Sequence, residues 1–394
     1  MARIVALGGA GHIGSCGVRE LAKRAPDIEI VIADYNLEAA TALAAEVGGR
    51  ASAVKVDAND FAGLVRTLQE ADVVISTIGP YYKYGETVVK AAIEARCNLV
   101  DVCDDGDAVK KELDLDESAR RAGISAIVGL GATPGITNLM AKRGSDRLDR
   151  VDEIQTAWGW TAIDPKMTGP AIVEHYLHAV TGSIVSYKDG GWVEIPAMST
   201  RKEVEFIAPV GLFGVAEVGH PEPVTLPRYI KGVREVTNFG GVWPKSFEDL
   251  AMVFVQLGLA GQKDLDIKGT KVPTRDVVTS IILQILDLAP DLVDRLVSEV
   301  YQSYGVFGLE GVVLRTDVRG EKDGQPTTFS YGCGSNADLL TSLPAVLGAL
   351  MLIRGQISQK GVAAPEGVVN PKAFFGELVK DIPVQEMVSR PISL

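Results

Sequence analysis

The sequence is poor in cysteine and in histidine, with four residues of each among 394. The cysteines are widely separated and show neither the short spacing of a metal site nor that of a disulfide framework. Scattered thiols of this kind suit a reducing compartment, where we expect all four to be free. They are Cys16, Cys97, Cys103 and Cys333.

Long apolar runs are also missing. The longest, residues 343–353, is far shorter than the ~20 residues of a membrane-spanning helix and is better explained as a buried helix. The apolar residues after Arg3 continue directly into a glycine-rich turn, without the cleavage region of a signal peptide. A cytoplasmic protein without a membrane partner is therefore expected.

Basic residues are outnumbered, since 39 Lys and Arg stand against 51 Asp and Glu and give a formal net charge of −12. Phosphate binding needs a basic surface, so this balance argues against a nucleic-acid partner. With 46% apolar and 23% charged residues, the chain has the composition of a soluble globular protein. Its length suits two domains, or one large domain with an insertion.

A dinucleotide-binding motif lies near the N-terminus. The apolar run 4–7 leads into Gly9, Gly11 and Gly14, and a helical pattern follows over 15–24. The first glycine permits the turn, the second lets the backbone approach a pyrophosphate, and the third lets the helix pack close on the strand. The N–H groups of that helix then face the phosphates. The cofactor-binding residues predicted in this loop are Gly9, Gly11, His12, Ile13 and Gly14.

Asp34 ends a second apolar run, residues 28–33, twenty positions after Gly14. A carboxylate at this place accepts hydrogen bonds from the adenosine ribose and repels a 2′-phosphate. The next residues, Tyr35 and Asn36, supply no arginine to offset that repulsion. NAD is therefore favoured over NADP as the cofactor.

The pattern after Asp34 completes an α/β fold with a parallel sheet of the Rossmann type. Helical spacing over 37–47 and 61–69 alternates with apolar strands at 52–57 and 72–77. Ligands of such sheets bind beyond the carboxyl ends of the strands. Further cofactor contacts are therefore predicted at the ends of these two strands, at Asp57, Ala58, Thr77, Gly79 and Pro80. For Asp57, a role in a turn or a helix cap is an equal alternative.

Substrate contacts are predicted in the three loops that follow. Tyr81 and Tyr84 belong to an aromatic cluster, and Asp101 and Asp104 flank the end of strand 98–103 in an acidic stretch suited to a cationic group. Strand 125–130 ends in a turn into a helix, whose free N–H groups would bind an anionic group such as a carboxylate. The residues of that turn are Thr133, Pro134 and Gly135.

From residue 151 onward the pattern changes to α+β, without strict alternation. We predict a Rossmann domain over 1–135, an α+β substrate or dimerisation domain over 136–340, and a helix and tail over 341–394 that return to the Rossmann domain. The second domain is expected to contain strands 151–160, 311–319 and 327–331, helices 169–180, 274–288 and 291–304, and a hairpin of 183–188 with 192–196 around Asp189 and Gly190.

Five separated motifs, in this order, give the chain its resemblance to a known family. They lie at 77–85, 98–103, 131–135, 219–227 and 355–367, so the similarity extends over nearly the whole chain. In these segments the chain resembles the saccharopine dehydrogenase-like oxidoreductases, and in length and layout it is most similar to the lysine 6-dehydrogenases of that family. The resemblance implies hydride transfer at a C–N centre of an amino acid or amine, with a nicotinamide cofactor.

Oxidation of an amine requires its uncharged form, so a base near neutral pH is needed, and histidine is the natural candidate. His220 lies in the fourth motif and is the predicted catalytic residue, with Asp104 as the next choice. His175 and His178 share the spacing of a metal-binding pair, but no acidic or cysteine partner stands at a useful distance in the sequence. Packing is the preferred interpretation of that pair, and no metal is predicted.

Two alternative functions stay open. The same fold can serve a condensing enzyme that joins an amine and a carbonyl through an imine, as relatives of the carboxynorspermidine and homospermidine type do. A sensor that binds NAD without catalysis is the other. The expected partners are a small amine or amino acid and further copies of the chain, in a homodimer or a higher oligomer.

Overall fold

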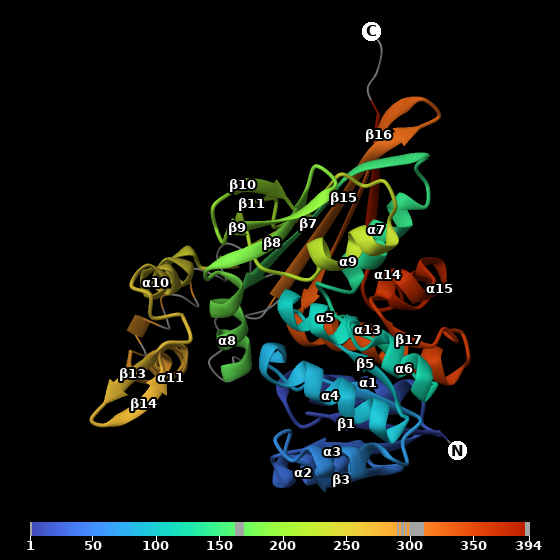
Figure 1. The fold of residues 1–394 in the computed structure, drawn as a ribbon, viewed down its shortest axis with the longest axis vertical. Helices are drawn as coiled ribbons and strands as arrows, with labels where there is room; N and C mark the ends of the chain where they lie inside the picture. Colours follow the sequence, from blue (N-terminus) through green and yellow to red (C-terminus); the bar gives the residue numbers. More distant parts are fainter. Residues whose placement is uncertain are drawn as a thin grey trace. The chain divides into compact units, whose positions relative to one another are not determined.

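The computed structural model describes residues 2–161, 169–289 and 311–390, with isolated positions between 291 and 298. The chain forms two compact units, each assembled from segments that are far apart in the sequence (Figure 1). The first unit comprises Met1–Arg143 and Ala337–Ile382, and the second comprises Gly144–Asn336 and Pro383–Leu394. The predicted boundaries stood at residues 135 and 340.

The first unit is built on a sheet of seven parallel strands, as the apolar runs predict. The order reverses between β1 and β4, so the chain leaves the sheet centre first on one side and then on the other. Ligands of such sheets bind near this switch point. In sheet order the strands are β17 (Gly361–Ala363), β6 (Ser125–Ile127), β5 (Asn98–Asp101), β4 (Val73–Ser76), β1 (Arg3–Leu7), β2 (Glu29–Asp34) and β3 (Ala51–Lys55).

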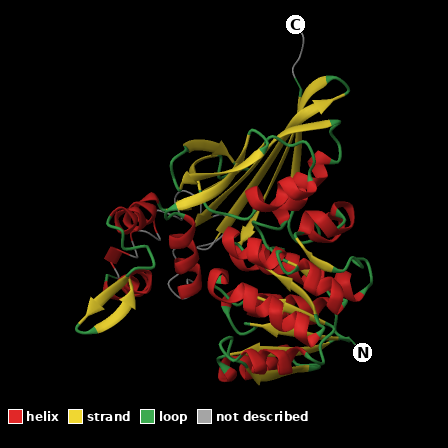
Figure 2. Ribbon diagram, in the orientation of Figure 1, coloured by secondary structure: helices red, strands yellow, loops and turns green. Residues whose placement is uncertain are grey.

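Helices flank this sheet (Figure 2). Polar residues fix several helix starts, because Asn36, Asp60 and Asn370 each accept the amide hydrogen bond of the residue three positions on. They precede α2 (Leu37–Val47), α3 (Phe61–Leu68) and α15 (Pro371–Leu378). The others are α1 (His12–Arg24), α4 (Tyr81–Ala95), α5 (Gly106–Leu113), α6 (Asp116–Ala122), α7 (Ile136–Ser145), α13 (Ala337–Ile353) and α14 (Pro365–Val368).

Helix α13 belongs to the first unit although more than two hundred residues separate it from β5 and β6. It packs against α1, β4 and β5, and most of its residues are buried. A helix that is apolar on nearly all sides needs such burial, so the predicted return of the chain to the Rossmann sheet is confirmed.

The second unit contains a mixed sheet of nine strands. Strand β7 lies at its centre, parallel to β12 and antiparallel to β15. Phe206, which follows β10, packs with Phe213 of β11 and Phe239 of β12 in an aromatic part of the core. The strands are β7 (Arg150–Thr161), β8 (Ser183–Lys188), β9 (Gly191–Pro196), β10 (Arg201–Glu205), β11 (Leu212–Glu217), β12 (Glu235–Trp243), β15 (Gly311–Lys322), β16 (Gln325–Asn336) and β18 (Gln385–Ser389).

Several local predictions for this unit are confirmed. Strands β8 and β9 form a hairpin in which Asp189 and Gly190 both have positive φ, 51° and 80°, as its tight turn requires. Helices α8 (Pro170–Ala179) and α11 (Thr274–Leu288) are also present. The predicted helix over 291–304 lies almost entirely outside the described residues. The remaining elements are α9 (Glu222–Tyr229), α10 (Lys245–Gln256) and the hairpin of β13 (Asp264–Ile267) with β14 (Thr270–Pro273).

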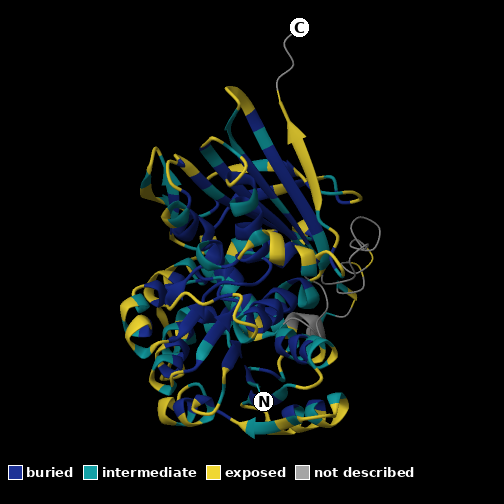
Figure 3. Cartoon of the chain, turned by 90° about the vertical axis from the view of Figure 1, so that its right-hand side faces the viewer, coloured by how far each residue is buried: buried dark blue, intermediate teal, exposed yellow. Residues whose placement is uncertain are grey.

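The C-terminal tail corrects one expectation. Its strand β18 does not pack on the Rossmann sheet but pairs antiparallel with β16 in the second unit. All five residues of β18 are exposed (Figure 3). An exposed edge strand is held by main-chain hydrogen bonds, so it has no apolar pattern from which its partner could be predicted.

Within the described part of the chain, no helix is both long enough and apolar enough to cross a membrane.

Candidate active site

The glycine loop joins β1 to α1 with very little room for side chains. A Cβ atom on Gly14 would overlap the carbonyl oxygen of Gly8 and would lie 2.8 Å from the Cα of Gly9. Helix α1 begins at His12, three residues before the expected start, and Gly11 precedes it without a side-chain cap. All of α1 is described, and its first turn holds no acidic residue. Its positive end therefore suits the phosphates of a dinucleotide.

Asp34 stands at the end of β2, beside this loop. Its Oδ2 atom accepts a hydrogen bond of 2.9 Å from the amide of Ala10, and its Oδ1 atom accepts one of 2.9 Å from the amide of Asn36. The carboxylate thus holds the loop in place as well as facing the position predicted for the ribose. Each oxygen keeps a second lone pair for a further donor.

His12 is tied to the C-terminal part of the first unit. Its Nε2 atom contacts Oδ1 of Asp338, at the start of α13. Thr77, at the end of β4, donates from its hydroxyl to the carbonyl oxygens of Leu7 and Gly8, at 3.2 and 3.1 Å. The glycine loop is therefore braced by a helix and a strand that the sequence alone did not connect to it.

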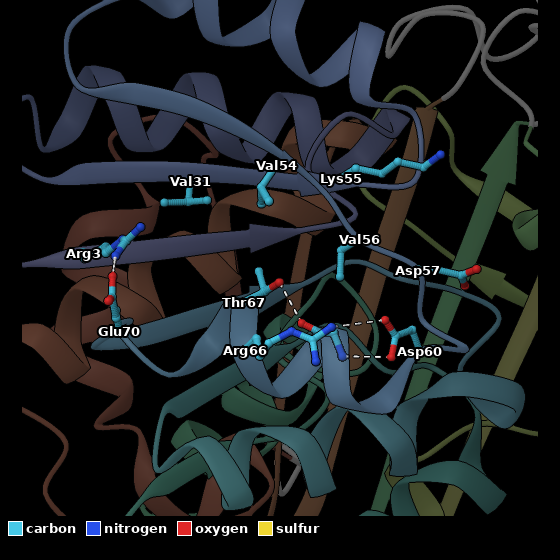
Figure 4. A pocket seen from close by; sticks show the side chains of 11 residues that line it. Arg3, Val31, Val54, Lys55, Val56, Asp57, Asp60, Arg66, Thr67 and Glu70 are labelled. Carbon is cyan, nitrogen blue, oxygen red and sulfur yellow. Dashed lines mark hydrogen bonds and ion pairs between the residues drawn. The ribbon is translucent and has the colours of Figure 1, made fainter.

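Asp57 and Lys55 lie at one end of a cavity of about 430 Å³ between β3 and α3, with Arg3 and Glu70 at the other end (Figure 4). None of the glycine-loop residues lines this cavity. Asp57 accepts a hydrogen bond of 2.9 Å from the amide of Asn59, which is the turn role that the sequence left as an alternative.

The predicted aromatic cluster does not form a loop, because α4 begins at Tyr81. Tyr81 is only 6% exposed, and its hydroxyl donates 3.1 Å to the carbonyl oxygen of Ser76. Tyr84 is half-buried in the same helical turn. The packing of Tyr81 against the sheet gives it a structural role, whereas substrate binding by either tyrosine stays a prediction.

Asp101 connects two of the loops at the carboxyl edge of the sheet. Its Oδ1 atom accepts from the amides of Cys103 and Gly129, at 2.9 and 2.8 Å. The side chain is 2% exposed, and this burial raises the pKa of its carboxyl to about 7. Asp105, rather than Asp104, meets the start of α4, where its Oδ2 atom accepts from the amide of Tyr82 at 2.9 Å.

Glu112 is a buried acid that the sequence analysis missed. It is 0% exposed, and its nearest polar partner is the thiol of Cys103, a weak hydrogen-bond donor. Burial, followed by the nearby charge of Asp101, raises the pKa of Glu112 well above its usual value. A Cβ atom on Gly85 would overlap Oε1 of Glu112, so the glycine in α4 leaves room for this acid. Its position four residues after Ala108 and three after Val109, on the apolar face of α5, is the sequence signal that could have identified it.

The turn Thr133–Gly135 has few amides left for an anion. The amides of Gly135, Ile136 and Thr137 donate to Asn138 Oδ1 and to the carbonyl oxygens of Gly131 and Ala132, respectively. These three donors are thus used within the turn. Substrate binding by Thr133, Pro134 and Gly135 stays a prediction that these amides do not support.

In the second unit, His220 forms a buried pair with Glu222. Its Nδ1 atom lies 2.7 Å from Oε2 of Glu222, and the two side chains are 2% and 0% exposed. The rings of Trp158 and His175 both lie near it, each with its centroid 5.8 Å from that of His220. The sequence signal for Glu222 was its place in the same Gly–His–Pro–Glu segment as His220.

Trp158 is itself fixed by polar contacts. Its indole N–H donates 3.1 Å to Oδ1 of Asn238, whose amide donates 2.8 Å to the hydroxyl of Thr156. His178 points elsewhere, because its Nδ1 atom lies 3.1 Å from the guanidinium of Arg275. The contact with Arg275 agrees with the packing interpretation of His178.

Two family models match consecutive parts of the chain and together cover most of it. The model "Saccharopine dehydrogenase NADP binding domain" matches residues 4–127, and "Saccharopine dehydrogenase C-terminal domain" matches residues 131–382. The chain belongs to the saccharopine dehydrogenase family. It is an NAD(P)-dependent oxidoreductase of the kind that acts on amino or imino groups.

Similar proteins of this family carry different reaction names. Carboxyaminopropylagmatine dehydrogenase of Synechocystis is 22% identical, with 99% of both chains covered. Carboxynorspermidine synthase of Vibrio cholerae is 24% identical, over 91% of this chain and 86% of the relative. The apo saccharopine dehydrogenase (L-Glu forming) of Saccharomyces cerevisiae has a similar structure, with a TM-score of 0.67, 18% identity and coverage of 99% and 100%. At that identity the likeness shows the fold alone.

Proposed function

We propose that the protein transfers hydride between a nicotinamide dinucleotide and the carbon of a C–N bond in an amino acid or amine, as in oxidative deamination or its reversal. The observation that carries this proposal is the buried pair of His220 and Glu222. Proton exchange with a substrate nitrogen needs a group that changes charge near neutral pH, and histidine is that group.

The proposed reaction has three steps. His220 takes a proton from the substrate ammonium, which restores the nitrogen lone pair. Loss of hydride from the carbon, as the lone pair forms the C=N bond of an iminium ion, would require a bound nicotinamide as the hydride acceptor. Water then adds to that carbon and the nitrogen leaves as ammonium, while His220 passes its proton to solvent. The products are a carbonyl compound, ammonium, a proton and the reduced dinucleotide.

Glu222 assists this reaction through His220. A carboxylate at Nδ1 favours the tautomer with a proton on that nitrogen, so Nε2 keeps the lone pair that accepts a proton. The negative charge then stabilises the imidazolium that forms. Trp158 packs near the imidazole ring, and its hydrogen bond to Asn238 keeps the indole in place.

A reductive condensation is the second candidate. Here an amine and a carbonyl compound would form an imine with loss of water, and a bound reduced dinucleotide would supply the hydride for its carbon. The names of the Synechocystis and Vibrio relatives support this candidate. So does the acidic segment of Asp104, Asp105 and Asp107, which suits a substrate with more than one ammonium group.

For the cofactor, we propose that Asp34 binds the adenosine ribose and that His12, Ile13 and the loop glycines surround the pyrophosphate. The lone pairs left on Asp34 fit the hydroxyls of NAD. The description of the matching N-terminal family model names NADP instead. We therefore propose that the choice between NAD and NADP depends on the charged groups around Asp34.

The test is a screen of amino acids, diamines and polyamines with NAD or NADP, monitored by the absorbance of reduced nicotinamide. Oxidative deamination predicts turnover with one organic substrate and release of ammonia or a cyclic imine. Condensation predicts oxidation of the reduced dinucleotide only when an amine and a carbonyl compound are both present. Dinucleotide binding with no turnover on any of these compounds would contradict both reactions and favour a sensor.

A further inference from the structure

We propose that Lys55 determines the cofactor preference and allows the enzyme to accept NADP as well as NAD. This inference rests on the proposed function, because it concerns the dinucleotide site at the end of β2. It weakens the preference for NAD that Asp34, Tyr35 and Asn36 indicate when they are considered alone. The reason is the positive charge that the sheet places next to Asp34.

Main-chain amides offset part of the negative charge of Asp34. Both of its oxygens already accept main-chain amides, Ala10 on one and Asn36 on the other, each at 2.9 Å. Two N–H dipoles pointing at a carboxylate offset part of its negative charge. Its repulsion of a 2′-phosphate is therefore weaker than that of a carboxylate without such donors.

The register of the sheet places Lys55 next to Asp34. Strand β3 pairs with β2 in parallel, and Lys55 is the register partner of Asp34. Neighbours of this kind lie on adjacent strands ~5 Å apart. The lysine therefore reaches the same edge of the sheet as the carboxylate, although 21 positions separate them in the sequence.

The charge of Lys55 is the third feature of this part of the sheet. Its side chain is exposed, and its ammonium group lies 5.2 Å from the ring centroid of Tyr35, the residue after Asp34. Among the described residues no carboxylate forms an ion pair with it, whereas nearby Arg66 lies 3.6 Å from Asp60. The positive charge of Lys55 thus stays available, and the exposed tyrosine ring holds it beside the predicted ribose position.

A 2′-phosphate on the ribose is a dianion at neutral pH, and an ammonium group with free donors is a suitable partner for it. The ribose of NAD carries no charge there, so Lys55 contributes little to its binding. Lys55 is therefore proposed to be a specificity-determining residue that distinguishes the two cofactors by charge.

The experiment measures the dissociation constants of NADPH and NADH by fluorescence titration of the full-length protein without substrate. We expect Lys55→Ala to weaken NADPH binding roughly tenfold or more, the loss of one charge-assisted contact, and to leave NADH within about twofold. Lys55→Arg should restore NADPH binding. Lys23→Ala, at the far end of α1 with its side chain 66% exposed, removes the same charge elsewhere and should change neither constant.

Equal effects of Lys55→Ala on the two dinucleotides, or no effect on either, would overturn this assignment. So would a wild-type protein that binds NADH and rejects NADPH. If neither dinucleotide binds the wild type, the cofactor site and with it the proposed function are wrong. Binding without turnover would refute the proposed reaction alone, because these titrations need no substrate.

Discussion

His220 and Glu222 face each other at 2.7 Å between Nδ1 and Oε2, with both side chains removed from solvent. Only Pro221 lies between them in the sequence, and the glutamate is the first residue of α9. Burial keeps water from competing for the carboxylate, so the contact strengthens as the imidazole gains a proton. The geometry is that of a base and the group that orients it.

We expect His220→Gln to lower the turnover of amine oxidation by roughly 10²–10⁴-fold, the usual contribution of a general base. Dinucleotide binding should be unchanged, since the glycine loop belongs to the other unit. Steady-state kinetics and a titration with NADH on one preparation measure both effects. The matched control is His178→Gln in the same unit. Wild-type turnover with an unchanged pH profile in His220→Gln would transfer the role of base to Asp104.

Glu222→Gln should preserve the packing and lower turnover, because a glutamine amide can donate to Nδ1 and favour the tautomer that leaves Nε2 protonated. Loss of the negative charge also removes the group that would stabilise the imidazolium formed during the reaction. Steady-state kinetics and thermal denaturation on one preparation measure the effect, and we expect a lower kcat with a melting temperature near that of the wild type. A purely structural role would instead lower the melting temperature and leave the turnover of the folded protein unchanged.

Replacement of Asp34 by Ala removes the proposed acceptor for the ribose and also the partner of the Ala10 and Asn36 amides. We expect weaker NAD binding, by ~1.5–3 kcal/mol for each lost charge-assisted hydrogen bond, and less discrimination against NADP. Asp34→Asn keeps one oxygen that can accept from a loop amide but removes the negative charge. It therefore separates the effect of loop support from the effect of charge on the choice of cofactor. An NAD-to-NADP preference identical to that of the wild type would contradict the assignment of Asp34 to the ribose.

The glycine loop can be tested by adding a single methyl group. Gly14→Ala forces a Cβ against main-chain atoms of Gly8 and Gly9, which should cost about 1–3 kcal/mol of stability and abolish tight dinucleotide binding. The control is Gly376→Ala in α15, where a Cβ meets nothing within 4 Å. That change should leave binding intact and slightly raise the melting temperature, because alanine favours a helix. Normal NADH affinity in Gly14→Ala would argue against the loop as the phosphate site.

Asp101 predicts a pH dependence of stability. Burial raises the pKa of its carboxyl from the ordinary 3.8 to about 7, so the folded protein keeps a proton that the unfolded chain has already released between these values. Folding then binds protons, and this contribution to stability falls as the pH rises from about 4 to about 7.

Asp101→Asn keeps an oxygen for the amides of Cys103 and Gly129 and removes the titration. The decline in melting temperature over that pH range should therefore become shallower than in the wild type. Thermal denaturation across the range measures it, with Asp264→Asn, an exposed site on β13, as the control. Parallel curves for wild type and Asp101→Asn would show that this carboxyl is already ionised at low pH.

Short-range features of the sequence were sufficient for much of the fold. The glycine loop, Asp34 after the second strand and the Asp189–Gly190 hairpin depend on residues close together in the chain, where steric limits on the backbone leave few choices. His220 was predicted because its chemistry and its motif coincide. The same reasoning identified the apolar helix α13 as an element that had to be buried.

Long-range pairing decided the rest. Parallel register placed Lys55 beside Asp34, and main-chain pairing placed β18 on β16, although neither choice leaves an apolar signature. Burial of Tyr81 and Glu112 depends on which helices cover them, and that is set by packing across the whole unit. Sequence alone therefore determined the conformation of the glycine loop and was enough to propose His220 as the base, since both depend on residues close together in the chain. Only the tertiary structure decided which charges surround them, because those charges come from strands and helices that meet through folding.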